Sequence, residues 1–300
     1  MVEASQKELH MTDHQRFIVI RHGESQTNAT DTFQAGNQTD LDPLTTLGME
    51  DARRLAERLA ELPVDVIVSS SYLRARSTAG AIADVTGAPH VVPVWKGSSW
   101  VDLPAKDPEL RDHVSLFREI DVPSELRGLR FDDPRAQEIQ HAALSVADLP
   151  DVHYSDEENL YDLWRRAEEM RRYLEARTER LIVVVAHGGI NKVWLAHLMF
   201  TAVAGLDTPT QLAAYRGFTR LGWWDNTGVL SLSFSPQQGW MWLMTDIQHL
   251  QPEYFSFMPS ARTVAVSHPD AGAEYLGGER HSSAGAMIRP VDGHRPRSQE

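Results

Sequence analysis

The fold is indicated most directly by the stretch FIVIRHGES at residues 17–25, where a short apolar run changes abruptly into charged and polar residues. An apolar run bounded in this way is typical of a buried strand that ends before Arg21. The stretch LIVVVAHGG at residues 181–189 has the same form, with an apolar run that stops at His187. Sites in open α/β sheets form at the carboxyl ends of strands, so the sequence predicts that His22 and His187 lie at such an edge.

Helix and strand patterns alternate along the rest of the chain. Apolar residues recur every three or four positions from Leu44 to Leu62, which predicts an amphipathic helix closed by Pro63. The further strands that we expect are 64–68, 91–94, 229–234 and 240–244, the last two joined as a hairpin by 236–239. A further helix is expected after the polar residues 69–71, running through Ala83, and another over 192–200. This order predicts an α/β fold with three layers, α/β/α, around a mostly parallel sheet.

A long helix is predicted just before the strand at 181–186. One of its faces is apolar as far as Leu174, and Ser155 followed by Glu158 three residues later has the spacing of a capping box. We therefore expect this helix to begin at Ser155.

The composition divides the chain into a main domain and two flanking segments. Residues 1–15 form a polar arm, and residues 16–258 carry the alternating pattern. Within that domain, residues 95–150 lose any simple alternation and carry several prolines and many charges, so we expect an inserted cap region there. Residues 259–300 contain one aromatic residue, Tyr275, and show no periodicity, which is typical of a disordered tail.

The composition also excludes several classes of protein. No apolar run approaches the roughly 20 residues of a membrane-spanning helix, and the polar start lacks a signal-peptide core, so we expect a cytoplasmic protein without a membrane partner. The absence of cysteine excludes disulfides, thiolate nucleophiles and cysteine-ligated metals. A net charge of −13 has the wrong sign for binding nucleic-acid backbones, so we expect no nucleic-acid partner.

Several short motifs follow one another in a specific order. They are RHGES at 21–25 with Asn28, LT at 44–45 with Gly48, SSSYLRA at 69–75 with Thr78, AHGG at 186–189, NTGV at 226–229 and QHL at 248–250. Taken together, this set resembles the histidine phosphatase superfamily, which is also called phosphoglycerate mutase-like. The resemblance covers approximately residues 17–250 and implies a phosphoglycerate mutase-like fold.

The resemblance implies a phosphatase that acts on a small phosphorylated substrate through a phosphohistidine on His22. A neutral imidazole can attack a phosphomonoester dianion without the repulsion that a carboxylate would meet. Arg21, Arg74 and His187 are the implied clamp for the phosphoryl oxygens, with Gly188 and the neutral donor Asn28 also at the phosphate. Asn28 is equally compatible with shaping a turn, and Ser25 with capping the loop. Because arginine and histidine supply the positive charge, we expect neither a metal nor a cofactor.

The proton donor is less clearly marked in the sequence. In the family this acid commonly follows a leucine-containing stretch after the third strand, and LFRE at 116–119, followed by Pro123 and Ser124, resembles that motif. We therefore favour Glu119, which would protonate the leaving alkoxide and then activate water. The shorter match at Leu110 keeps Asp112 and Glu109 open as alternatives.

Two other functions remain open at this point. One is a mutase of the same fold, although phosphoglycerate mutases usually have a tryptophan before the asparagine, where this chain has Thr27 before Asn28. The other is a noncatalytic relative that binds phosphate or a partner. The mixed charge of residues 95–150 fits sugar phosphates, nucleotides or cofactor precursors equally well. The strand pair at 229–244 could offer an edge for a homodimer.

Overall fold

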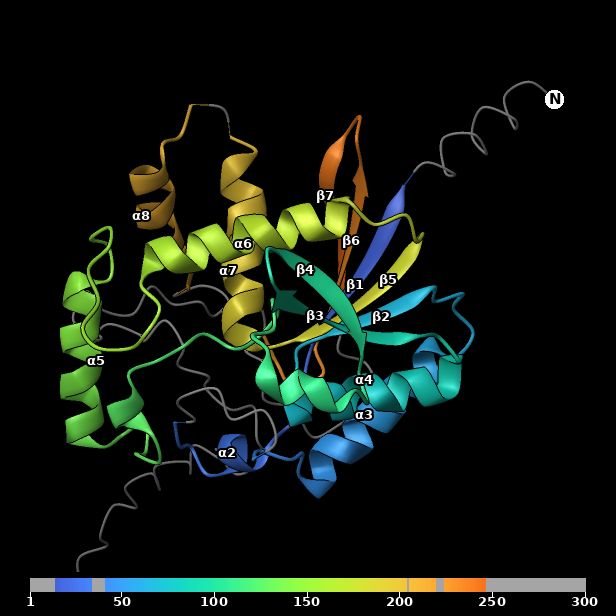
Figure 1. Cartoon of the computed structure of the whole chain (residues 1–300), viewed down its shortest axis with the longest axis horizontal. Helices are drawn as coiled ribbons and strands as arrows, with labels where there is room; N and C mark the ends of the chain where they lie inside the picture. Colours follow the sequence, from blue (N-terminus) through green and yellow to red (C-terminus); the bar gives the residue numbers. More distant parts are fainter. Residues whose placement is uncertain (1–13, 34–40, 204, 220–223, 247–300) are drawn as a thin grey trace, which may run out of the picture.

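The computed structural model describes residues 14–33, 41–203, 205–219 and 224–246. They form a seven-stranded sheet with the order β4-β3-β2-β5-β1-β6-β7 (Figure 1). The strands are β1 (Gln15–Arg21), β2 (Val66–Ser69), β3 (His90–Lys96), β4 (Ser99–Pro104), β5 (Leu181–Ala186), β6 (Val229–Ser235) and β7 (Gly239–Asp246). The four central strands β3, β2, β5 and β1 pair in parallel, and the outer strands pair antiparallel. The mostly parallel sheet is thus confirmed.

Helices cover both faces of the sheet, as the alternation of side chains along the strands requires. Phe17 and Val19 of β1 pack with α6, α7 and α8, while Ile18 and Ile20 pack with α3 and α4 on the opposite face. The helices are α2 (Gln26–Ala29), α3 (Thr46–Leu59), α4 (Leu73–Thr86), α5 (Pro134–Val146), α6 (Leu160–Glu175), α7 (Gly188–Thr201) and α8 (Thr208–Thr219), with short 3-10 helices η1 (Pro108–Asp112) and η2 (Ser124–Leu126). The three-layer α/β/α architecture is confirmed.

The segment expected as an inserted cap begins inside the sheet. Residues 95–96 complete β3, and β4 pairs antiparallel with β3 to extend the sheet edge. None of the side chains of β4 is fully buried. Because the strand has no buried face, its sequence shows no alternation of apolar and polar residues that would predict it. After η1, the chain builds a separate small core in which Leu126 and Ile139 of η2 and α5 pack with Phe33.

The N-terminal cap of α6 lies four residues after the expected one, so the capping box at Ser155 and Glu158 is wrong. The cap residue is Asn159, whose side chain accepts from the backbone N–H of Asp162, while the Asp162 carboxylate accepts from the N–H of Asn159. The physical reason is that Glu158 is used elsewhere. Its carboxylate is bound by two arginines, Arg118 and Arg166, which compete successfully with a capping role.

The sequence does not predict α2 and α8, and the other remaining elements differ from expectation at their ends. The hairpin of β6 and β7 is confirmed, and α7 starts directly after His187 instead of at Lys192. Over the described ranges, no helix is both long and apolar enough to cross a bilayer. The predicted arm at 1–15 lies mostly outside the described residues, as do the tail at 259–300 and the QHL motif at 248–250.

Candidate active site

His22 and His187 meet at the carboxyl edge of the sheet, as the sequence predicts. They follow the adjacent parallel strands β1 and β5, where Arg21 and Ala186 are paired in register. The N–H of His22 donates to the carbonyl of Ala186 at 2.9 Å. The two imidazole rings are fully buried, with their centroids 5.0 Å apart. Parallel pairing of two strands therefore suffices to bring these distant histidines together.

The contacts of the His22 ring assign its tautomer. Its Nδ1 lies 2.7 Å from the carbonyl oxygen of Gly23, and a carbonyl can only accept, so Nδ1 carries the proton. Its Nε2 accepts from Nε of Arg74 at 3.1 Å. The lone pair of Nε2 therefore points toward the guanidinium of Arg74.

Two arginines that the sequence predicts at the phosphate, Arg21 and Arg74, are both buried. Arg21, 1% exposed, donates from Nη1 to the backbone carbonyl of Trp224 at 2.7 Å. Arg74 lies in the first turn of α4, its Nη1 is 3.4 Å from a carboxylate oxygen of Asp42, and its guanidinium carbon is 5.0 Å from the Tyr72 ring centroid. Buried guanidinium groups at a helix N-terminus favour an anion.

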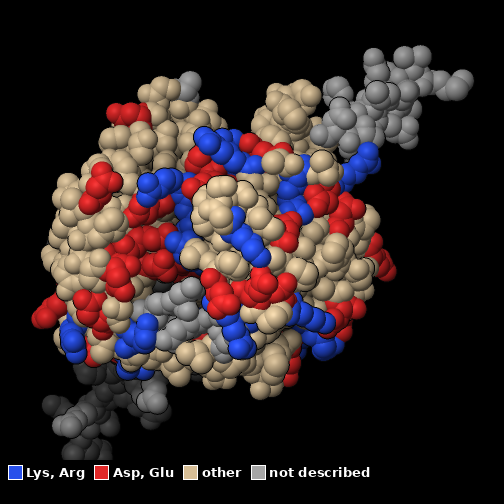
Figure 2. Space-filling view, in the orientation of Figure 1, with Lys and Arg blue, Asp and Glu red and all other residues tan. Residues whose placement is uncertain are grey.

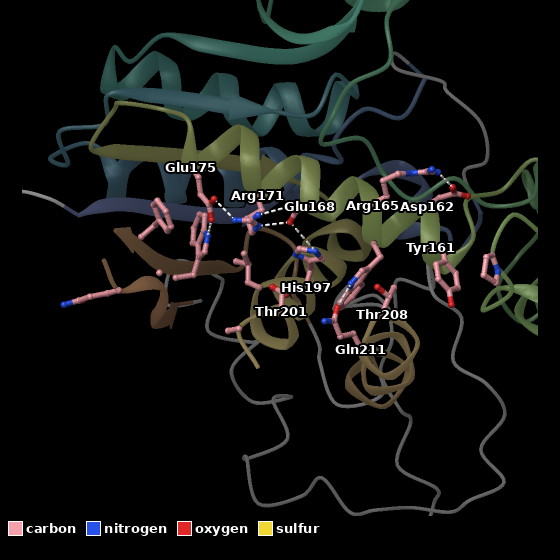
Figure 3. A pocket seen from close by; sticks show the side chains of 18 of the residues that line it. Tyr161, Asp162, Arg165, Glu168, Arg171, Glu175, His197, Thr201, Thr208 and Gln211 are labelled. Atoms are coloured by element: carbon pink, nitrogen blue, oxygen red, sulfur yellow. Dashed lines mark hydrogen bonds and ion pairs between the residues drawn. The ribbon is translucent and has the colours of Figure 1, made fainter. Parts of the chain in front are cut away.

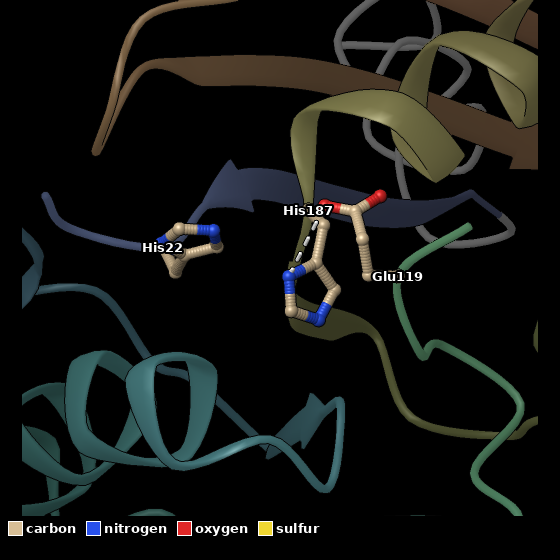
Figure 4. A group of neighbouring side chains, drawn as sticks. All are labelled: His22, Glu119 and His187. Carbon is tan, nitrogen blue, oxygen red and sulfur yellow. Dashed lines mark ion pairs between the residues drawn. The ribbon is translucent and has the colours of Figure 1, made fainter. Parts of the chain in front are cut away.

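His187 lies between a hydroxyl and a carboxylate. Its Nε2 is 2.8 Å from Oγ of Ser70, and its Nδ1 is 3.5 Å from a carboxylate oxygen of Glu119. Figure 4 shows His22, His187 and Glu119 arriving from three separate segments of the chain and pointing toward one another. When protonated, the imidazole could donate to Ser70 and Glu119 at once and still carry a positive charge beside His22.

Glu119 is carried by the loop between η1 and η2. One of its carboxylate oxygens accepts from the backbone N–H of Ile120 at 2.9 Å. A Cβ on Gly189 would lie only 2.8 Å from that same oxygen, Oε1 of Glu119. Gly189 therefore allows the carboxyl group to sit against the first turn of α7.

The two alternative acids lie elsewhere. Glu109 is exposed on η1 and pairs with Lys96 at 2.8 Å. Asp112 is exposed at the end of the same short helix. Among the described residues, the cluster with both histidines contains Glu119 and neither of these acids.

Asn28 and Ser25 shape the loop after β1. Ser25 caps α2, and Oδ1 of Asn28 accepts from the N–H of Ser25 at 3.2 Å. The same oxygen accepts from Nδ2 of Asn226, which also donates to the carbonyl of His22. The turn-shaping reading of Asn28 thus has direct support.

Gly188 is the first residue of α7 and is buried. Its position gives the pocket the positive end of a helix of 14 residues. The backbone N–H groups of a first helical turn have no partner inside the helix, so they suit an anionic oxygen.

Sequence reasoning missed Ser70, Tyr72 and Gly189 as site residues. Burial raises the pKa of the Tyr72 phenol to about 12, with the charge of Asp121 acting in the same direction, so the ring that packs against His187 stays neutral. All three lie directly after β2 or β5. The position at a strand end, which singled out the histidines, could have identified them.

The side chains of His22, Glu119 and His187 are also a ligand set that zinc accepts, since their ligand atoms lie within 4.8 Å of one another. However, the guanidinium of Arg74 contacts the His22 ring, and the buried Arg21 directly precedes His22 in the chain. Their charge opposes a cation and favours a phosphoryl group. The arrangement fits an anion site better than a metal centre.

A groove of about 960 Å³ lies between α6, α7, α8 and the β6–β7 turn (Figure 3). Its lining includes Glu168 and Arg171, which form an ion pair, and His197, which lies 3.6 Å from Glu168. His197 is ten residues beyond His187, or about 15 Å along the helix. This groove is therefore separate from the histidine cluster.

Acidic and basic side chains are interspersed over the face of the molecule seen in Figure 2.

Comparison with known proteins places this site in a family. The model of the histidine phosphatase superfamily, branch 1, matches residues 17–96 and 109–235. A glucosyl-3-phosphoglycerate phosphatase from Mycolicibacterium vanbaalenii is 30% identical over 190 residues, which cover 61% of this chain and 74% of the relative.

Two further likenesses are a short match in sequence and a broader match in structure. The 2,3-bisphosphoglycerate-dependent phosphoglycerate mutase 1 of Arabidopsis thaliana is 45% identical over 62 residues, which cover 21% of this chain and 18% of the mutase. The solved structure of a phosphoserine phosphatase from Entamoeba histolytica in complex with 3-phosphoglyceric acid has a TM-score of 0.54 at 19% identity, covering 79% of this chain and all (100%) of that chain. This second likeness concerns the fold alone.

Proposed function

The chain belongs to the histidine phosphatase superfamily, and we propose that it hydrolyses a small phosphomonoester through a phosphohistidine on His22. One observation carries the proposal. The unprotonated Nε2 of a buried histidine faces the guanidinium of Arg74 at 3.1 Å, with the ring of His187 beside it. A nucleophile with its lone pair aimed at an anion-binding group is the arrangement that attack on phosphorus requires.

In the first step, Nε2 of His22 forms a bond to phosphorus while the bond from phosphorus to the leaving oxygen breaks. The proton on Nδ1 stays with the Gly23 carbonyl and stabilises the positive charge that develops on the ring. Arg74 turns from Nε2 to the phosphoryl oxygens, where Arg21, His187 and the N–H of Gly188 also donate. Donors fixed in advance toward developing charge provide much of the rate enhancement in such sites.

Glu119 supplies the proton for the leaving oxygen. In the second step its carboxylate takes a proton from water, whose oxygen bonds to phosphorus as the bond to His22 breaks. One carboxyl group can serve both steps because each leaves it in the state that the next requires. Its support is its place beside both histidines, within the distance that spans the cluster.

The test is a rapid-quench experiment with a ³²P-labelled substrate. We expect the native protein to yield an acid-labile, base-stable phosphoenzyme, and His22→Ala to yield none. The matched control is His90→Ala, since His90 hydrogen-bonds Ser69 and lies outside the cluster. Label that persists in His22→Ala would overturn the assignment of the nucleophile.

A mutase is the second candidate, favoured by the short match to a phosphoglycerate mutase. Such an enzyme would return the phosphoryl group to another oxygen of the substrate instead of giving it to water. Phosphate release without a bisphosphorylated primer supports the phosphatase. Dependence on such a primer, with isomerised product and little free phosphate, supports the mutase.

The identity of the substrate is best sought with a panel of phosphomonoesters. We include glucosyl-3-phosphoglycerate because of the name of the relative that matches over 190 residues. Sugar phosphates, nucleotides and cofactor precursors complete the panel, each assayed with and without a chelator. A protein inert across this panel that still binds phosphate would support the noncatalytic alternative. The homodimer and the cytoplasmic location stay predictions.

A further inference from the structure

The loop that carries Glu119 is held from beneath by a buried arginine of α6. Arg166 is 4% exposed, and its Nη1 donates to the backbone carbonyl of Arg118 at 2.7 Å. The carbonyl of Glu119 itself lies 3.5 Å from both terminal nitrogens of the same guanidinium. A planar guanidinium that contacts two successive carbonyls fixes the direction in which the intervening side chain leaves the backbone.

Glu158 provides a second connection between Arg166 and the loop, through its carboxylate. Its carboxylate accepts from Nη2 of Arg166 at 2.6 Å and from Nη2 of Arg118 at 2.8 Å. The backbone N–H of Asp121 also donates to it at 3.0 Å, and the N–H of Glu158 donates back to the carbonyl of Asp121 at 3.0 Å. One carboxylate thus ties the residues on both sides of Glu119 to the chain just before α6.

The charges of this group balance. Arg118 also pairs with Asp121 at 3.2 Å, so two arginines face two carboxylates. A lone cation beneath a proton donor would favour the ionised carboxyl and weaken it as an acid. A balanced quartet can hold the loop by hydrogen bonds without imposing a net charge on the catalytic carboxyl.

We propose that Arg166 and Glu158 are positioning residues for proton transfer, which act by fixing the Glu119 loop and do not touch the substrate. This inference rests on the proposed phosphatase function. Its specific consequence is that their loss should affect the protonation of the leaving group and spare the attack of His22 on phosphorus.

The test uses two aryl esters of similar shape, p-nitrophenyl phosphate and phenyl phosphate. The p-nitrophenolate leaves readily without a proton, whereas the more basic phenolate needs one. We expect Arg166→Lys to lower kcat on phenyl phosphate by roughly tenfold to a hundredfold, since a displacement of about 1 Å can cost roughly a hundredfold. The kcat on p-nitrophenyl phosphate and both KM values should change little.

The matched control is Arg171→Lys on the same helix, where Arg171 pairs with Glu168 and Glu175 and does not contact the loop. It should leave the ratio of the two kcat values unchanged. Glu158→Gln should reproduce the selective loss, and it serves as the test if Arg166→Lys does not give a cooperative thermal melt.

A double-variant comparison separates positioning from general damage. In a Glu119→Gln background the acid is already gone, so Arg166→Lys should cause no further loss on phenyl phosphate. An equal loss on both esters, no loss on either, or an additive loss in this background overturns the inference. A native protein that hydrolyses neither these esters nor any ester of the substrate panel would refute the proposed function itself.

Discussion

Helix α7 carries two histidines that each lie near a glutamate at almost the same distance. His187, at the N-terminal cap, is 3.5 Å from Glu119, and His197, farther along the helix, is 3.6 Å from Glu168. Both imidazoles are buried. One pair belongs to the histidine cluster, and the other lines the separate groove (Figures 3 and 4). The distance between a histidine and a glutamate is therefore a poor guide to function.

The difference lies in the neighbours of each carboxylate. Glu168 accepts from Arg171 at 2.7 Å and from Arg172 at 2.6 Å, and the hydrogen bond from Arg171 is the main reason that its pKa falls to about 2. Burial lowers the pKa of His197 to about 4, despite the opposing charge of Glu168. At neutral pH this pair is a fixed carboxylate beside a neutral ring, which neither gives nor takes a proton.

The largest effect that separates the two pairs should come from the glutamates. Glu119→Gln removes the proposed acid, and we expect kcat on phenyl phosphate to fall roughly a hundredfold to ten-thousandfold. Glu168→Gln should leave kcat nearly unchanged. Steady-state kinetics on purified variants measure both. Comparable losses in the two variants would erase the distinction drawn between the pairs.

The second largest difference in kcat should appear between variants of the two histidines. His187→Gln removes a proposed donor to the phosphoryl oxygens, and the loss of such a donor typically costs roughly a hundredfold to a thousandfold in kcat. His197→Gln should retain most of the activity, since its ring lies about 15 Å along the helix from His187. A His197→Gln enzyme as slow as His187→Gln would place the groove in the reaction.

The pH dependence of stability should report His197. A histidine with a pKa of about 4 in the folded protein and 6.5 unfolded stabilises the fold fully above pH 6.5, and this contribution is lost as pH falls toward 4. The full shift corresponds to roughly 3 kcal/mol. Chemical denaturation between pH 7 and pH 4 should therefore show a shallower decline for His197→Gln than for the native protein.

His90 offers an internal comparison for that measurement. Burial lowers its pKa to about 4 as well, so His90→Gln should flatten the same pH range. The double variant should be the flattest of the set. Parallel declines for the native chain and both single variants would show that these rings are not the source of the acid sensitivity.

The smallest expected effects come from two glycines. Gly189→Ala would place a Cβ 2.8 Å from the Glu119 carboxylate, so we expect a loss of kcat of roughly tenfold as the acid is displaced. Gly80 lies inside α4 with nothing within 4 Å of a new Cβ, and Gly80→Ala should stabilise the fold by about 0.5–1 kcal/mol. A stabilised, fully active Gly189→Ala protein would mean that the carboxyl group does not need its present position.

The sequence predicts those parts of the fold that depend on residues close together along the chain. The strands around Val19 and Val184 were predictable because each is a continuous apolar run buried on both faces. Their parallel pairing then brought His22 and His187 together without further information. Strand β4 was not predictable, since its mostly exposed side chains carry no such pattern.

The choice among the acids could not be settled from the sequence for a related reason. Glu119 lies on a loop whose course depends on Arg166 and on Glu158, and Glu158 pairs with Arg118 across 40 positions of the chain. No local periodicity records that contact. Because Glu158 pairs with Arg118, it does not form the capping box that its spacing from Ser155 predicts.

The antiparallel direction of β6 has a consequence for how the protein is made. Because β6 runs opposite to β1, its beginning lies at the catalytic edge, and the turn before it supplies Asn226, which binds the carbonyl of His22 across 204 positions. On the ribosome, His22 thus emerges long before the segment that secures its loop. Contacts so distant in sequence form late in folding. An incomplete nascent chain should therefore be inert toward phosphate esters, and activity should appear only after the sixth strand has been translated and docked.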